Sequence, residues 1–161
     1  MLDDRRRKWF DGIVWTAATV YIAMLVDTAQ AADHRYPVDN ATYQSECGSC
    51  HVAYPARLLP AESWRRIIAG LSAHFGADAS LDADSAAAIE HYLTSSARRP
   101  RRKESTTPLR ITETTWFRHE HDEVPHRWWD SPAVRGPSDC GACHTKADRG
   151  QFGESGIRRP K

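Results

Sequence analysis

Two five-residue stretches decide the fold of this chain: Cys47-Gly48-Ser49-Cys50-His51 and Cys140-Gly141-Ala142-Cys143-His144. Together they contain all of the chain's cysteines, and in both of them histidine directly follows the second cysteine. The pattern C-x-x-C-H is typical of c-type haem attachment, in which two thiols bond to the porphyrin vinyl groups and the histidine binds the iron. The sequence therefore predicts two covalent haem c groups, attached through Cys47, Cys50, Cys140 and Cys143.

Other uses of paired cysteines fit this pattern less well. A Cys₄ zinc site usually brings together pairs separated by about 15–20 residues, whereas these pairs lie at 47–50 and 140–143. A thioredoxin-type redox pair follows a strand, and no strand pattern precedes either motif. Two local disulfides stay possible in an oxidising compartment. None of these alternatives explains the repeated histidine, so we predict His51 and His144 as iron ligands.

The overall composition favours neither nucleic acid nor an anionic membrane as the main partner. The chain has 22 basic and 21 acidic residues, a formal net charge of +1, so no strong field attracts an oppositely charged polymer. Mean hydropathy is −0.63, and apolar material for a conventional core is scarce. Small domains commonly need stabilisation beyond their own hydrophobic core, and two porphyrins would supply additional apolar surface to bury.

The N-terminal segment has the three regions of a secretory signal peptide. A basic run at 5–8 precedes a mostly apolar, uncharged stretch at 13–26, and Ala29-Gln30-Ala31 matches the small-x-small cleavage pattern. The apolar stretch is shorter than the ~18 residues expected of a spanning helix. We therefore predict a signal peptide over residues 1–31 and export to the periplasm, where haem c is attached. An uncleaved membrane anchor is the alternative.

Residues 32–97 form the first predicted haem domain. A short helix is expected to carry the first motif. A second helix is expected over residues 62–76, opened at Glu62-Ser63 and ended by Gly76. Its apolar face contains Trp64, Ile67, Ile68, Leu71 and Phe75. His74 lies on the same face, and in a small core beside a haem iron it is a candidate sixth ligand. A hydrogen-bonded core histidine is the alternative.

A third helix is predicted after a cap at Ser80 or Asp82, with an apolar face of Ala86, Ile89, Leu93 and Ala97. His91 lies off this face and is expected to be exposed. His34 lies near the predicted new N-terminus, where chains are poorly ordered, and it is not expected to bind iron.

Residues 98–108 are predicted to be a basic linker, and residues 109–161 a second haem domain. The run Arg98-Arg99-Pro100-Arg101-Arg102-Lys103 favours a solvated connector, with a docking patch for an acidic redox partner as the alternative. Residues 111–117 are rich in β-branched and aromatic residues and predict an extended segment. Little other regular structure is expected here. Trp128 and Trp129 are candidates to cover a haem face.

Methionine is absent from the predicted mature chain. The only methionines are Met1 and Met24, both in the signal segment. Because haem c carriers commonly use methionine as the second axial ligand, histidine is the expected sixth ligand at both irons. Two imidazoles give a lower potential than a histidine–methionine pair. The histidines outside the two motifs are His34, His74, His91, His119, His121 and His126.

The sequence resembles the small periplasmic dihaem cytochromes c of the DHC type over nearly all of the mature chain. In the first half the similar residues are Cys47 through Tyr54-Pro55, Leu58-Leu59-Pro60, Ser63-Trp64, His74-Phe75-Gly76 and Ala79-Ser80-Leu81-Asp82. In the second half they are Arg110-Ile111-Thr112, Trp116-Phe117, His121, the motif at 140–144, Ala147, Gly150, Phe152 and Pro160.

The resemblance implies a mainly α fold, with an N-terminal domain like class I cytochrome c and a largely irregular C-terminal domain. It implies bis-histidine iron at both haems, with His74 as the sixth ligand of the first haem and His121 as that of the second. His119 and His126 lie close enough in sequence to stay alternatives to His121.

The function implied by the resemblance is electron transfer rather than catalysis. The expected partner is a small oxygen-binding monohaem cytochrome, sometimes together with a membrane cytochrome b. An iron with six ligands has no position for a substrate, so its chemistry is outer-sphere electron transfer. The alternative is a haem enzyme or gas sensor with one five-coordinate haem. A third possibility is a docking subunit of a larger respiratory complex.

Overall fold

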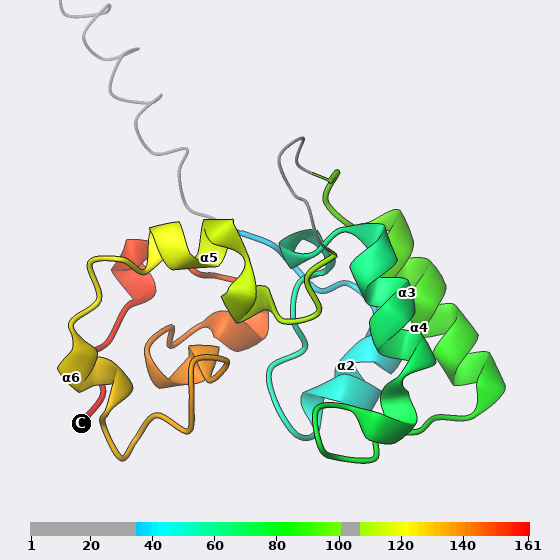
Figure 1. Ribbon diagram of the computed structural model, residues 1–161, viewed down its shortest axis with the longest axis horizontal. Helices are drawn as coiled ribbons and strands as arrows, with labels where there is room; N and C mark the ends of the chain where they lie inside the picture. The colour runs from blue at the N-terminus through cyan, green and yellow to red at the C-terminus, as the bar shows by residue number, and fades with distance from the viewer. Residues whose placement is uncertain (1–34, 101–106) are drawn as a thin grey trace, which may run out of the picture. The chain divides into compact units, whose positions relative to one another are not determined.

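Short helices and 3₁₀ turns joined by loops make up the computed structural model, which describes residues 35–100 and 107–161 (Figure 1). Within these ranges β-structure is limited to isolated bridges, so the mainly α prediction is confirmed. No helix among these residues is long and apolar enough to cross a membrane. The predicted signal segment at 1–31 and His34 lie outside the described residues.

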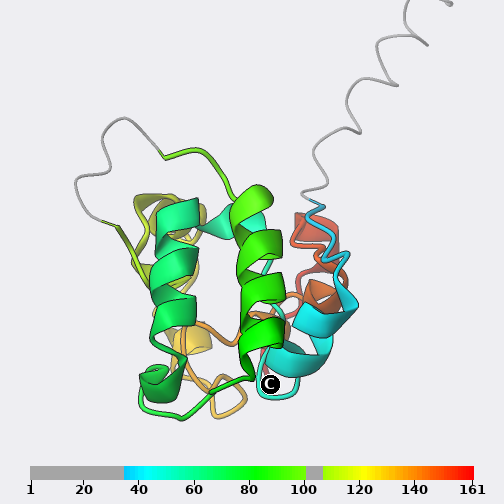
Figure 2. The same cartoon turned by 90° about the vertical axis from the view of Figure 1, so that its right-hand side faces the viewer.

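Three helices surround the main hydrophobic core: α2 (Ala41–Gly48), α3 (Ala61–Ala69) and α4 (Ala83–Ser95). Helices α3 and α4 pack side by side, as both views show (Figure 2). The buried residues of this core are Val38, Tyr43, Ala56, Leu59, Trp64, Ile89 and Leu93. The Trp64 indole N–H donates to the Ala56 carbonyl at 2.7 Å, which satisfies the one polar atom that this large side chain brings inside.

Helix α4 follows the predicted pattern closely. The Asp82 carboxylate accepts the Ser85 N–H at 2.9 Å and caps the first turn. Ile89 and Leu93, one turn apart, are 0% and 1% exposed. His91 points to solvent as expected.

The predicted helix over residues 62–76 is wrong in its second half. Helix α3 ends at Ala69, because Gly70 has backbone angles outside the helical region and glycine costs about 1 kcal/mol more than alanine in a helix. A 3₁₀ turn, η3 (Leu71–Ala73), follows, and His74 comes directly after it. Phe75 then has a φ of +52° and is 46% exposed rather than inward.

The second half of the unit contains two short helices, α5 (Thr115–Glu120) and α6 (His126–Trp129). The extended segment predicted for 111–117 is wrong, since this stretch forms η4 (Ile111–Glu113) and the first half of α5. The reason is local, because the Thr114 hydroxyl accepts the Phe117 N–H at 3.1 Å and starts the helix. The remaining regular structure is a series of 3₁₀ turns: η5 (Cys140–Ala142), η6 (Ala147–Arg149) and η7 (Glu154–Gly156).

Backbone contacts tie residues distant in sequence to the second motif. The Arg158 N–H donates to the Cys143 carbonyl at 2.8 Å, so the C-terminal tail lies against the motif. The Tyr36 N–H donates to the Gly150 carbonyl at 2.7 Å, which links the start of the unit to its end. The described residues belong to one compact unit, and the division into domains at 32–97 and 109–161 stays a prediction.

Candidate haem-binding sites

The first motif lies where α2 ends. Cys47 is in the last turn of the helix, which stops at Gly48, and Cys50 and His51 follow on the turn beyond it. His51 Nδ1 is 2.7 Å from the Val52 carbonyl oxygen. A carbonyl only accepts hydrogen bonds, so this contact assigns the proton to Nδ1 and leaves Nε2 bare. A bare Nε2 is the form of histidine that binds a metal.

His74 faces His51 across this site. The centroids of the two imidazole rings are 6.3 Å apart, and their planes are inclined by 25°. Burial lowers the pKa of His74, and the neighbouring His51 lowers it further. Both effects favour the neutral imidazole, the state a metal ligand requires. The structure thus places the predicted residue opposite His51, although a 3₁₀ turn positions it instead of the expected helix.

The second motif is a single 3₁₀ turn. The His144 N–H donates to the Cys140 carbonyl at 2.8 Å, which brings the histidine back over its own cysteine pair. The Phe152 ring meets the His144 ring edge-on at 5.4 Å. His144 Nδ1 is buried and has no hydrogen-bond partner, and burial lowers the pKa of this imidazole, with a further contribution from His121.

His121 faces His144, with ring centroids 6.1 Å apart and planes inclined by 77°. His121 directly follows the last residue of α5 as its C-cap, and its Nδ1 is 2.8 Å from the Phe117 carbonyl oxygen, which again leaves Nε2 bare. The Phe117 ring stacks on the imidazole at 4.0 Å and 19°. The two competing candidates do not reach this position, since the side chain of His119 is 80% exposed and His126 is also exposed.

Both ring separations match the spacing of two imidazoles on one iron. With a nitrogen–metal bond of about 2.0 Å and roughly 1.1 Å from that nitrogen to the ring centroid, two axial imidazoles have centroids about 6.2 Å apart. The measured separations are 6.3 and 6.1 Å. The residues of both sites therefore fit a haem iron held between two histidines.

No disulfide joins any of the four cysteines. Within 35–100 and 107–161, no three His, Cys, Asp or Glu side chains converge as a metal site would require. This arrangement does not support the zinc alternative.

The second site has little protein core of its own. In residues 107–161 the buried hydrophobic side chains are Phe117 and Ala147. A cavity of about 320 Å³ lies beside His121. The ring centroids of Trp129 and His121 are 5.9 Å apart. The residues lining this cavity are Thr112, Phe117, Arg118, His121, Trp129 and Pro137. A cavity with a largely apolar lining, in a region with few buried side chains, fits a porphyrin, whose apolar faces would pack against these residues.

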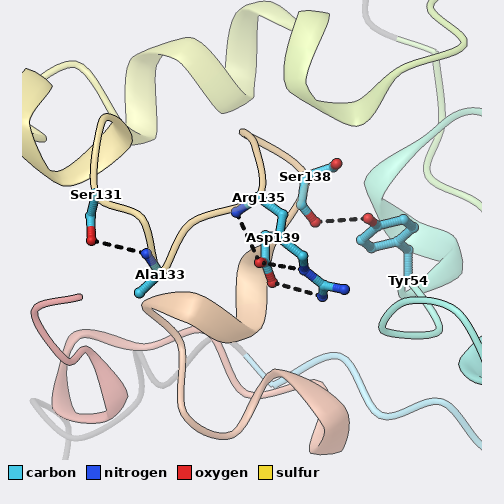
Figure 3. Close-up of polar contacts among 6 residues, drawn as sticks. All are labelled: Tyr54, Ser131, Ala133, Arg135, Ser138 and Asp139. Atoms are coloured by element: carbon cyan, nitrogen blue, oxygen red, sulfur yellow. Dashed lines mark hydrogen bonds and ion pairs between the residues drawn. The ribbon is translucent and has the colours of Figure 1, made fainter. Parts of the chain in front are cut away.

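One residue of the sites was missed by sequence reasoning. The Tyr54 ring stacks on His51, with centroids 4.7 Å apart and planes inclined by 19°. Its hydroxyl donates to the Ser138 carbonyl at 2.8 Å, two residues before Cys140 (Figure 3). Burial raises the pKa of Tyr54 to about 12, which keeps the phenol protonated and able to donate. The two partners are 84 positions apart, so no local pattern could have revealed the contact.

Comparisons with known proteins find dihaem cytochromes c similar to this chain. A family model described as dihaem cytochrome c matches residues 43–152. A solved dihaem cytochrome c from Shewanella baltica OS155 is 46% identical, with a TM-score of 0.66 over 74% of this chain and 92% of its own. A dihaem cytochrome c from Rhodobacter sphaeroides is 44% identical, with a TM-score of 0.68 over 73% of this chain and 99% of its own.

A second Rhodobacter sphaeroides structure, of purified DHC, is 48% identical, with a TM-score of 0.64 over 72% of this chain and 99% of that one. No curated protein matches the chain. The family match covers more than half of the sequence, and both C-x-x-C-H motifs lie within it. The chain therefore belongs to the dihaem cytochrome c family and carries two covalently bound haem c groups.

Proposed function

We propose that this protein is an electron carrier whose two haems each have two histidine ligands. In this proposal His51 and His74 bind the first iron, and His144 and His121 bind the second. The cysteines of the two motifs, Cys47, Cys50, Cys140 and Cys143, hold the porphyrins by thioether bonds. The observation that supports the proposal is the pair of ring separations, 6.3 and 6.1 Å, both at the spacing of two axial imidazoles.

The chemistry follows from the ligand set. A bound haem c supplies a reversible one-electron ferric–ferrous couple, and two protein ligands leave its iron no position for a substrate. The protein's own contribution is to set the potential. Hydrogen bonds from His51 Nδ1 and His121 Nδ1 to backbone carbonyls make these imidazoles stronger donors to iron, which stabilises the ferric state. Both haems are therefore expected to have low potentials.

Location and partner are inferred from the family and the N-terminal sequence. Members of the c-type cytochromes are typically exported, and residues 1–31 have the pattern of a signal peptide. We place the mature protein in the periplasm, where it would exchange electrons with another cytochrome. The partner class proposed here is a small oxygen-binding monohaem cytochrome, or a membrane cytochrome b.

Carbon monoxide separates this function from that of a haem enzyme or gas sensor. The dithionite-reduced holoprotein is mixed with carbon monoxide, and its absorption spectrum is recorded. Two bis-histidine haems predict no change. A carbon monoxide adduct at either haem would mean an open iron position and would support the enzyme or sensor alternative. The binding stoichiometry would show how many haems are involved.

The partner is tested separately by mixing the reduced holoprotein with an oxidised monohaem cytochrome c in a stopped-flow instrument. Electron transfer supports the carrier role if its final extent matches the difference between the reduction potentials of the two proteins. No transfer to any monohaem cytochrome, despite a favourable potential difference, would contradict it.

A further inference from the structure

Tyr54 contacts both haem sites at once. Its ring lies on the His51 imidazole, 4.7 Å between centroids and nearly parallel at 19°. Its hydroxyl donates to the Ser138 carbonyl at 2.8 Å. The same carbonyl accepts the Cys140 N–H at 3.0 Å. One side chain therefore connects an axial ligand of the first site to the first attachment cysteine of the second.

The tyrosine backbone is held in place by the hydrophobic core. The hydroxyl of Tyr43, a residue only 2% exposed, donates to the Tyr54 carbonyl at 2.8 Å. The next residue, Pro55, is fully buried and its ring fixes the local backbone. The ring of Tyr54 thus projects from a rigid segment, so its position between the two sites is set by the fold rather than by chance contact.

The receiving loop is also fixed. The Arg135 guanidinium donates to Asp139 Oδ2 through Nε at 3.0 Å, and the Arg135 backbone N–H donates to the same oxygen at 3.3 Å (Figure 3). The Asp139 N–H donates to the Gly136 carbonyl at 3.0 Å. These bonds close the loop on both sides of Ser138. Its carbonyl is therefore presented to the tyrosine hydroxyl in one orientation.

We propose that Tyr54 couples the two haem sites and carries internal electron exchange between them; this inference rests on the electron-carrier function proposed above. The path runs from the His51 imidazole through the stacked phenol and its hydrogen bond to the backbone of Ser138, and from there to Cys140. The exchange moves a single electron. The donor site goes from ferrous to ferric and the acceptor site from ferric to ferrous, with no proton or covalent bond involved.

Three substitutions in the full holoprotein test the proposal. Tyr54→Phe keeps the stacked ring and removes only the hydrogen bond to Ser138. Tyr54→Leu removes the ring as well. Tyr92→Phe is the matched control, because it also removes one tyrosine hydroxyl bonded to the backbone, the 3.2 Å contact from the Asp39 N–H, and that contact touches neither motif.

The exchange rate is measured by two-dimensional exchange NMR of the haem methyl signals in half-reduced samples. Dilution separates exchange within a molecule from exchange between molecules. Redox potentials, ferric spectra and thermal unfolding are recorded for the same samples. We expect Tyr54→Phe to slow internal exchange several-fold while both potentials and both ferric spectra stay as in the parent. Tyr54→Leu should slow exchange at least as much and alter the ferric signal of the first haem.

Equal internal rates in Tyr54→Phe, Tyr92→Phe and the parent would overturn the proposal, because exchange would then bypass the phenol. A slower rate accompanied by a shifted potential or spectrum at the second haem would also overturn it, since Tyr54 would then only hold the loop. A parent protein that binds carbon monoxide would instead mean failure of the proposed carrier function, which is a separate result.

Discussion

His121 and His144 face one another with ring planes inclined by 77°. The planes of His51 and His74, at almost the same separation, are inclined by only 25°. At the second site Phe117 stacks on His121, and the Phe117 backbone carbonyl accepts the hydrogen bond from His121 Nδ1. With the ring held on one face and at one edge, the plane of His121 is fixed independently of His144.

Removal of His121 should open the second haem. In His121→Ala the iron loses its proposed sixth ligand, and we expect that haem to become high-spin and to bind carbon monoxide, while the first haem stays low-spin. The carbon monoxide adduct should therefore amount to about one of two haems per chain. Absorption spectra of the ferric and reduced forms measure both effects.

The exposed neighbours provide the control for that experiment. His119→Ala and His126→Ala remove imidazoles that point to solvent, so both haems should stay low-spin. A low-spin second haem in His121→Ala, with a high-spin one in either control, would assign the ligand to the other histidine.

Exchange of His74 for methionine should raise the potential of the first haem. Thioether ligation favours the ferrous state, so His74→Met is expected to shift that potential upward by on the order of 0.1 V, within the ~0.8 V range that axial ligands cover. A spectroelectrochemical titration resolves the two haems. His91→Met, on the exposed face of α4, is the control and should change neither potential. An unshifted first potential in His74→Met would reject His74 as ligand.

Substitution of Gly150 by a residue with a side chain should destabilise the fold. Its φ is +67°, and a Cβ there would lie 2.0 Å from the Tyr36 carbonyl oxygen. Gly150→Ala should therefore lower the free energy of unfolding by roughly 1–3 kcal/mol, from backbone strain and from loss of the Tyr36 contact. Gly156, with nothing within 4 Å of its would-be Cβ, is the matched control. Denaturant unfolding compares the two, and equal stabilities would contradict the close approach.

The sequence was most informative where local rules act alone. Asp82 and the spacing of Ile89 and Leu93 predicted α4 correctly, because a cap and a buried face both depend on residues a few positions apart. The C-x-x-C-H motifs predicted the cofactor for the same reason, since cysteine and histidine spacing within one turn sets the attachment chemistry.

Local interactions also explain why two of the predicted secondary-structure elements are wrong. The apolar stripe continues past Gly70 and suggested one long helix, but glycine ended α3 and a 3₁₀ turn carried His74 into the site. Residues 111–117 have strand-like composition, yet the Thr114 cap outweighed that preference and started α5. In both cases one residue overruled the average propensity of its segment.

The remaining features depend on contacts that no short pattern contains. Sequence spacing could not choose among His119, His121 and His126, since three histidines within eight positions give too little periodicity. In the structure His121, at the end of α5, is the one that lies opposite His144, and this placement supports its proposed role as ligand. The bond between Tyr54 and Ser138 is likewise a product of the tertiary fold.

Low-temperature electron paramagnetic resonance of the ferric holoprotein tests the central claim most directly. Two bis-histidine haems with different ring inclinations predict two low-spin signals of equal intensity. The pair at 25° should give a rhombic spectrum, and the pair at 77° a highly anisotropic one with a larger maximum g value. In His121→Ala only the anisotropic signal should disappear. A high-spin signal in the parent protein, or two identical low-spin signals, would contradict the account.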